Sequence, residues 1–258
     1  MAQHDHTYAV IMAGGVGSRF WPMSRSGRPK QFLDILDRGR TLIQMTADRL
    51  EPMVPADRMY VVTNARYKAD ILDQLPGIPE DQVLCEPFMR NTAPCLAYAA
   101  QRIVQRDSEA TMVVAPADHL IADEAGFRDV LSVAVDRASE TNQLLTLGIT
   151  PTRPDTGYGY IQYEDLPDAG DDRLRQVRTF TEKPDRELAE QFLASGDFCW
   201  NAGIFVWSVQ TILDRFEDQM PDLHALFEER KADFGTRAEE EALLAIYGAA
   251  ENISIDYG

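Results

Sequence analysis

Short apolar runs recur along the first 150 residues of the chain, and stretches with helical spacing separate them. The runs lie at residues 8–12, 59–63, 82–85, 111–115 and 143–147. Between them, apolar positions repeat every three or four residues, most clearly over 93–104 and 127–138, which predicts helices with one buried face. Nearly all-apolar strands that alternate with helices predict an α/β fold, with a mainly parallel, Rossmann-like sheet flanked by helices on both faces.

The pattern changes in the second part of the chain. Extended stretches follow at 158–163, 173–183 and 201–207. They predict antiparallel strands inserted beside the first half. Residues 210–250 have a helical and strongly charged pattern, and the alternation of Ile255 and Tyr257 with polar residues or glycine at 254–258 predicts a short strand. We therefore expect one domain over residues 1–258, with two halves at 1–150 and 151–258.

The composition excludes several classes of protein. Of the 258 residues, 45% are hydrophobic and 26% are charged, which is enough for a substantial core. The formal net charge of −17 disfavours a polyanion-binding surface, so we expect no nucleic-acid partner. Cys85, Cys95 and Cys199 are odd in number and lack metal-ligand spacing, which predicts reduced thiols. No signal-peptide pattern and no apolar run of about 18 residues occur, so we expect a soluble, cytoplasmic protein with no membrane partner.

A glycine-rich segment directly follows the first apolar run. It contains Gly14, Gly15 and Gly17, and the cations Arg19 and Lys30 come after them. Ligands bind at the carboxyl ends of strands in an open α/β sheet, where glycines let backbone N–H groups approach a polyphosphate. A tight turn that needs positive φ is the alternative for the glycines alone. The spacing fits neither the dinucleotide fingerprint nor the P-loop, and Pro22 prevents a helix from continuing through the segment;.

Asp118 follows the apolar run at 111–115 and is a candidate metal ligand. A carboxylate at the carboxyl end of a strand is placed to hold Mg²⁺, which bridges phosphate oxygens in phosphoryl chemistry. Capping of the next helix is the structural alternative. The sequence has no G-x-S-x-G nucleophile elbow, which disfavours covalent catalysis.

Polar groups suited to a sugar phosphate lie in the second half of the chain. Lys183 can hold a phosphate and Glu182 can accept hydrogen bonds from hydroxyl groups, although a solvated surface pair is the alternative. Gly157 and Gly159 offer backbone groups to a ligand, or a glycine bulge in an edge strand. Asn201 lies among apolar residues, so its amide needs partners from either a substrate or the neighbouring backbone.

The first half contains a further polar segment, Glu86-Pro-Phe-Met-Arg-Asn-Thr-Ala-Pro94, before the helix predicted over 93–104. Asn91 or Thr92 can cap that helix, which is the structural alternative to a binding role.

Six motifs, taken in order, resemble those of the nucleotidyltransferases that make nucleotide sugars, and most closely their mannose-1-phosphate guanylyltransferase branch. They are G-G-x-G-x-R, P-K-Q, E-P-x-x-R-N-T-A-P, P-A-D-H, F-x-E-K-P and S-I-D-Y, and the resemblance covers residues 8–258. It implies that GTP and mannose 1-phosphate react to give GDP-mannose and pyrophosphate. The sugar phosphate would attack the α-phosphorus in line, so catalysis would rest on positioning and charge neutralisation.

The resemblance also implies roles for individual residues, with 1–150 as the nucleotide-binding half and 151–258 as the sugar-phosphate-binding half. The nucleotide-binding residues would be Ala13, Gly14, Gly15, Gly17, Ser18, Arg19, Lys30, Glu86, Asn91, Thr92 and Asp118. The sugar-phosphate-binding residues would be Gly157, Gly159, Glu182, Lys183 and Asn201. Arg19, Lys30 and Lys183 would be the catalytic cations, and Asp118 and Asp256 would bind Mg²⁺.

Three alternatives stay open at this point. The chain could act on another sugar or base, it could be a glycosyltransferase on a similar sheet, or it could be a non-catalytic nucleotide-binding module. Members of the family continue past the position of residue 258, so we expect a truncated nucleotidyltransferase core. A homodimer is compatible with the sequence.

Overall fold

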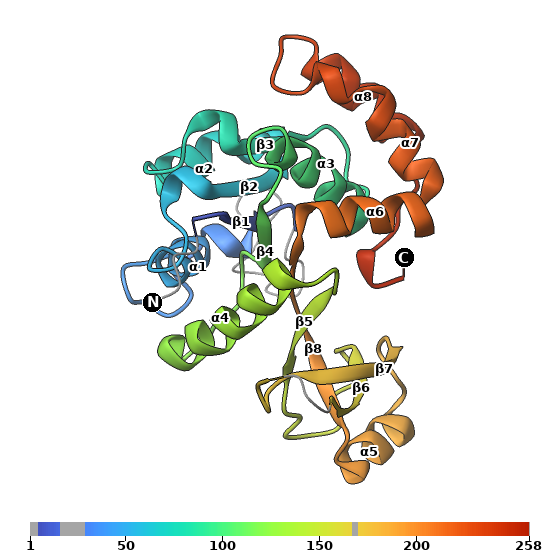
Figure 1. Cartoon of the computed structure of the whole chain (residues 1–258). Helices are drawn as coiled ribbons and strands as arrows, with labels where there is room; N and C mark the ends of the chain where they lie inside the picture. The colour runs from blue at the N-terminus through green and yellow to red at the C-terminus, as the bar shows by residue number, and fades with distance from the viewer. Residues whose placement is uncertain (1–4, 16–28, 167–169, 258) are drawn as a thin grey trace.

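The computed structural model describes residues 5–15, 29–166 and 170–257, and the strands within them form one eight-stranded sheet (Figure 1). The strands are β1 (Thr7–Met12), β2 (Met59–Asn64), β3 (Val83–Glu86), β4 (Thr111–Pro116), β5 (Leu145–Ile149), β6 (Tyr160–Asp165), β7 (Arg175–Thr181) and β8 (Phe198–Ser208). Their order is β3-β2-β1-β4-β8-β6-β7, and β5 pairs with β8.

The first four strands form the predicted parallel part of the sheet. β1 pairs in parallel with β2 and β4, and β2 pairs in parallel with β3. β1, β2 and β4 are almost wholly buried, as expected for strands covered on both faces. Because these strands are parallel, their carboxyl ends lie at one edge of the sheet, where open α/β folds bind ligands.

The remaining strands form the predicted antiparallel part, and the long strand β8 joins it to the parallel part. One end of β8 pairs antiparallel with β4, and the other end pairs antiparallel with β6. Phe205 pairs with both Val114 of β4 and Thr146 of β5, so β5 runs along the opposite edge of β8 from β4. The two halves predicted from the sequence therefore share one continuous sheet.

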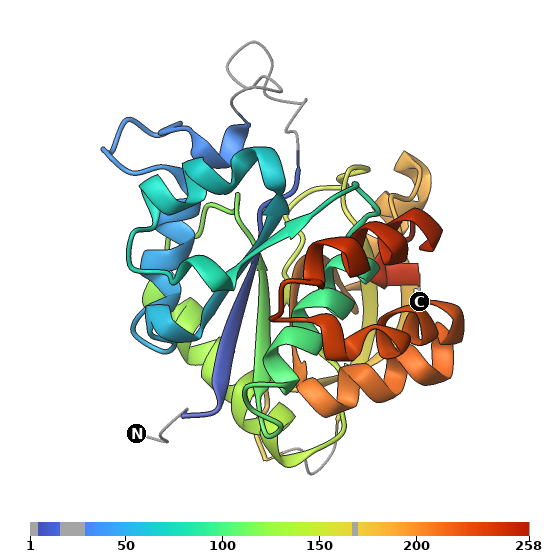
Figure 2. The ribbon, with the colours of Figure 1, turned by 90° about the horizontal axis from the view of Figure 1, so that it is seen from above.

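Helices cover both faces of the sheet, as Figure 2 shows from above. They are α1 (Leu42–Leu50), α2 (Lys68–Gln74), α3 (Thr92–Val104), α4 (Glu124–Glu140), α5 (Arg186–Ser195), α6 (Val209–Gln219), α7 (Pro221–Glu229) and α8 (Glu239–Ala249). Ala9 and Ile11 pack with α1, α2 and α4, whereas Tyr8 and Val10 pack with α3, α6, α7 and α8. This alternation follows from the two-residue period of a strand, and it confirms the predicted covering of both faces.

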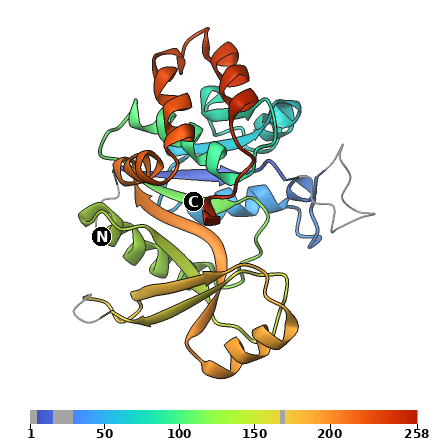
Figure 3. The same ribbon diagram turned by 90° about the vertical axis from the view of Figure 1, so that its right-hand side faces the viewer.

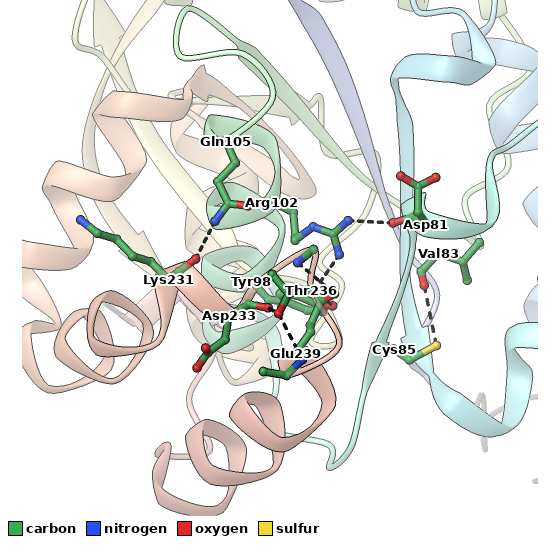
Figure 4. A network of polar contacts seen from close by, with 12 residues as sticks. Asp81, Val83, Cys85, Tyr98, Arg102, Gln105, Lys231, Asp233, Thr236 and Glu239 are labelled. Atoms are coloured by element: carbon green, nitrogen blue, oxygen red, sulfur yellow. Dashed lines mark hydrogen bonds and ion pairs between the residues drawn. The ribbon is translucent and has the colours of Figure 1, made fainter.

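The carboxyl-terminal helices are tied to α3 by the polar network in Figure 4. The Tyr98 hydroxyl and the Arg102 guanidinium both donate to Glu239 at the start of α8, at 2.7 and 2.6 Å. Arg102 also donates to the carbonyl of Asp81 at 3.1 Å. Since α3 begins at Thr92, this network fixes the start of α8 relative to the helix that follows one of the predicted nucleotide-binding segments.

The prediction of a strand at 254–258 is wrong. Residues Ile255–Tyr257 form a 3₁₀ turn, and Figure 3 shows this segment returning from α8 towards the middle of the sheet. The Ala93 N–H donates to Ile253 O at 3.1 Å, and the Ile255 N–H donates to the Thr92 hydroxyl at 2.9 Å. The segment therefore makes its hydrogen bonds with the start of α3, and no strand edge among the described residues pairs with it.

Two smaller predictions can be compared with the structure. Cys85, Cys95 and Cys199 are free thiols, as predicted. Within the described ranges, no helix combines the length and the apolar character that crossing a membrane requires.

Candidate active site

The start of the glycine-rich segment lies at the carboxyl end of β1, and Gln31 fixes it. The Gln31 amide donates to Ala13 O at 2.9 Å and to Gly15 O at 3.0 Å. The Thr63 hydroxyl donates to Ala13 O at 3.1 Å. Sequence reasoning gave Gln31 no role, although it belongs to the P-K-Q motif. Gly17, Ser18 and Arg19 lie outside the described residues.

Lys30 and Asp118 form an ion pair at this edge of the sheet. Lys30 opens the 3₁₀ turn Lys30–Phe32, and Asp118 comes two residues after the end of β4. Their side chains are 25% and 23% exposed, so both reach solvent from a partly enclosed position. The structure thus brings together two residues that the sequence assigned separately to the transferred phosphate and the metal.

Glu86 is the most unusual carboxylate of the region because it is buried without a full set of partners. It is 7% exposed, and among the described residues its Oε1 atom has no hydrogen-bond partner. A Cβ atom on Gly14 would lie 3.4 Å from Glu86 Oε2, so the carboxylate faces the glycine-rich segment. Burial raises the pKa of Glu86 to about 7, and a contact with the Tyr247 hydroxyl opposes the shift.

Of the two residues considered as caps of the helix, the structure assigns the capping contact to Asn91. Asn91 is the N-cap of α3, and its side-chain oxygen accepts from the Thr92 N–H at 3.1 Å. Asn91 has φ of 66° and Lys183 has φ of 45°, and only Asp37 shares this conformation among the other non-glycine residues that the structure describes. Positive φ is costly for such residues and concentrates at functional sites.

A chain of hydrogen bonds connects Thr92 to Asn201 through the carboxyl-terminal segment. The Thr92 and Ser254 hydroxyls are 3.0 Å apart, and Ser254 donates to Asp256 Oδ2 at 2.7 Å. Asn201 Nδ2 donates to Asp256 Oδ1 at 3.0 Å. The Asn201 side-chain oxygen accepts from the Gly203 N–H at 2.9 Å. The predicted metal ligand Asp256 therefore lies between residues assigned to the two substrates.

The predicted magnesium ligands fit the ion in their chemistry. Asp118 and Asp256 offer carboxylate oxygens, and Mg²⁺ in phosphoryl-transfer sites uses one or two carboxylates together with substrate phosphates. No cluster of three or more His, Cys, Asp or Glu side chains suited to a metal occurs in the part of the chain that the structure describes.

Four of the predicted sugar-phosphate residues are close together. A Cβ atom on Gly159 would lie 2.6 Å from Glu182 Oε2 and 3.5 Å from Asn201 Cβ. The Glu182 carboxylate therefore occupies space that a side chain at position 159 would need. The Asn201 N–H donates to Gly159 O at 2.8 Å, and Lys183 forms an ion pair with Glu182. Gly157 instead lies in a local turn, where its N–H donates to the Asp155 side chain at 2.8 Å.

Known proteins share both the sequence pattern and the fold. The nucleotidyl transferase family matches residues 8–237. A mannose-1-phosphate guanylyltransferase of Salmonella typhimurium is 39% identical over 261 residues, covering 97% of this chain and 53% of that protein. A mannose-1-phosphate guanylyltransferase of Escherichia coli K12 is 36% identical, covering 100% of this chain and 54% of that protein. The chain spans about half the length of these curated relatives.

A solved structure gives the same picture. The crystal structure of a protein described as mannose-1-phosphate geranyltransferase, from Thermus thermophilus, superimposes with a TM-score of 0.86 and 34% sequence identity. The superposition covers 98% of this chain and 70% of that one.

Proposed function

Because the chain belongs to the nucleotidyl transferase family, we propose that it transfers a guanylyl group from GTP to mannose 1-phosphate. The products would be GDP-mannose and pyrophosphate. The names of the Salmonella and Escherichia coli relatives support this choice of substrates. These substrates also agree with the expectation of a cytoplasmic enzyme, and the homodimer stays a prediction.

The buried carboxylate of Glu86 is the observation that carries the choice of guanine. Its Oε1 atom lacks a hydrogen-bond partner within the described ranges, and its Oε2 atom faces Gly14. Guanine presents two adjacent donors, N1–H and the 2-amino group, which match the two acceptor oxygens of an ionised carboxylate. Uracil and thymine present one N–H between two carbonyl oxygens, so the same carboxylate would repel them. A buried polar group that only one base satisfies gives strong discrimination.

The proposed mechanism needs no nucleophile from the protein. An oxygen of the sugar phosphate forms a bond to the α-phosphorus of GTP, while the bond from that phosphorus to the bridging oxygen breaks and pyrophosphate leaves. Lys30 would stabilise the charge that builds up on the transferred phosphoryl group, and Lys183 would orient the attacking phosphate. Gly14, Gly15, Gly17, Ser18 and Arg19 would hold the leaving pyrophosphate. Mg²⁺, when bound by Asp118 and Asp256, would supply further charge neutralisation.

A substrate panel tests the proposal. The purified chain is incubated with mannose 1-phosphate or glucose 1-phosphate and with GTP, ATP, UTP or dTTP, and pyrophosphate release and nucleotide-sugar formation are measured. We expect GTP with mannose 1-phosphate to be preferred. Preference for UTP or dTTP would overturn the choice of base. Binding of GTP without product formation at high protein concentration would favour the non-catalytic module.

The pH dependence of GTP binding tests the role of Glu86. Above pH 7, the ionised carboxylate accepts both guanine donors, whereas protonation below its pKa of about 7 removes one acceptor. We therefore expect KM for GTP to rise as pH falls below 7. The Glu86→Gln variant should raise KM at least about tenfold, because an amide offers one acceptor and mismatches the second donor, and it should flatten the pH profile. An unchanged profile in the variant would contradict this role, and Glu240→Gln on the exposed side of α8 is the control.

A further inference from the structure

A buried guanidinium contacts the residue that follows Asp118 and has no role in the mechanism above. Arg49, in α1, is only 2% exposed, and burial lowers its pKa. The Arg49 Nε atom has no hydrogen-bond partner among the described residues. Taking a charge out of water costs several kcal/mol unless good partners repay it. An apolar side chain would therefore fill this position at lower cost, which points to a use for the charge.

Within the described residues, the polar and cation–π contacts of the Arg49 side chain lie on one segment of the chain. Its Nη2 atom donates to His119 O at 3.3 Å. Its Nε atom is 3.7 Å from Glu124 Oε1, and its guanidinium lies 5.9 Å from the centre of the Phe127 ring. Glu124 is the first residue of α4, and Asp118 precedes His119. The guanidinium thus links His119, within the connection between β4 and α4, to the first residue of α4. His119 directly follows Asp118, the residue that pairs with Lys30.

We propose that Arg49 is a positioning residue that holds the main chain at His119 and thereby keeps the Asp118 carboxylate in place beside Lys30. The expected effect of Arg49 on turnover rests on the proposed function. A carbonyl held by a cation resists rotation of the adjacent peptide, and a displacement of about 1 Å at a reacting group can cost roughly a hundredfold in rate. No contact of Arg49 with a substrate is required.

Two substitutions separate positioning from packing. Arg49→Met keeps the length and apolar contacts of the side chain but removes every donor, and Arg49→Lys keeps the charge but loses the fork of donors. Arg128→Met is the matched control. Arg128 lies 3.7 Å from Glu124 and donates to Arg49 O at 3.4 Å, so this variant removes a neighbouring cation and leaves the bond to His119 O in place.

Hydrogen–deuterium exchange of the substrate-free protein is the first measurement. We expect exchange over residues 117–123 to be at least about fivefold faster in Arg49→Met than in wild type, to be intermediate in Arg49→Lys and to be unchanged in Arg128→Met. This measurement does not depend on enzymatic activity. It therefore tests the positioning role even if the chain does not catalyse the proposed reaction. Unchanged exchange over 117–123 in a folded Arg49→Met protein would overturn the proposal.

Steady-state kinetics well below the unfolding temperature is the second measurement. We expect Arg49→Met to lower kcat at least about tenfold with little change in KM for mannose 1-phosphate, and Arg49→Lys to recover part of the loss. A lower Tm with wild-type kcat would assign Arg49 to packing and overturn the proposal. If Arg49→Met does not fold, the same two measurements on Arg49→Lys decide between positioning and packing. Faster exchange over 117–123 with a kcat reduced at least about threefold supports positioning, and wild-type values of both overturn it.

Discussion

Each half of the molecule contains a lysine–carboxylate pair made of predicted site residues, and the two pairs are held in different ways. Lys30 and Asp118 come from distant parts of the sequence and meet at the carboxyl ends of parallel strands. Lys183 and Glu182 are neighbours in the sequence at the end of an antiparallel strand. The Lys30 side chain is 25% exposed, whereas that of Lys183 is 51% exposed.

This difference indicates which lysine suits which task. The main chain around Lys30 is fixed by the buried Gln31 amide, and the position of Asp118 is set by β4. Lys183 has a positive φ of 45°, and its ion pair is with its own neighbour in the sequence. A fixed cation is suited to charge that develops in the transition state. A more exposed cation can adjust to a substrate that arrives from solvent.

Loss of the fixed cation should have the largest effect. We expect Lys30→Ala to lower kcat by more than about a hundredfold, the scale seen when one transition-state electrostatic group is removed. Its Tm should change little, because a partly exposed ion pair adds little stability. Steady-state kinetics and thermal unfolding measure the two effects.

The control for this variant is Lys68→Ala, which breaks the surface pair of Lys68 with Glu80 at 2.9 Å. That variant should keep wild-type kcat. A Lys30→Ala enzyme with near-normal turnover would remove the distinction between the two pairs.

Loss of the exposed cation should act on binding instead. We expect Lys183→Ala to raise KM for mannose 1-phosphate roughly tenfold, as a charge-assisted hydrogen bond to the phosphate is lost, and to leave kcat within about threefold of wild type. Lys231→Ala, which breaks a surface pair with Glu228, is the control. An unchanged KM would make Lys183 a solvated surface residue, and a kcat loss as large as that of Lys30→Ala would erase the predicted division of tasks.

The same contrast explains how much of the fold was predictable. β1, β2 and β4 are buried on both faces, so their apolar runs stand out in the sequence. β7 is mostly exposed, and its residues contain no continuous apolar run. The segment at 254–258 was mispredicted because its conformation depends on bonds to Thr92 and Ala93, far away in the chain. Contacts of that kind leave no periodic signal in the sequence.

The candidate site was predictable to a similar extent. Position at strand ends, together with the family motifs, indicated Lys30, Asp118 and Glu86, and the structure places all three at one edge of the parallel strands. The contacts of Gln31 and Arg49 were not predicted, because each depends on which carbonyl a buried side chain reaches. A buried polar residue in a motif or a helix is recognisable in the sequence, but its partner is not.

Crowding the Lys183–Glu182 pair should have the smallest effect, and it tests what holds the Glu182 side chain in position. An alanine at position 159 would put a Cβ atom 2.6 Å from Glu182 Oε2. This oxygen is at the end of a flexible side chain, so we expect Glu182 to turn away at little cost to the free energy of unfolding, within about 0.5 kcal/mol. Its ion pair with Lys183 would then weaken. KM for mannose 1-phosphate should rise about threefold in Gly159→Ala.

The control is Gly248→Ala in α8, where nothing lies within 4 Å of the added Cβ atom. It should leave KM unchanged and raise Tm slightly, because alanine is favoured over glycine within a helix. If Gly159→Ala keeps wild-type KM while Lys183→Ala raises it, Lys183 binds the sugar phosphate without help from Glu182. The second pair would then be a chance contact of neighbours, whereas the Lys30–Asp118 pair depends on the fold that brings its members together.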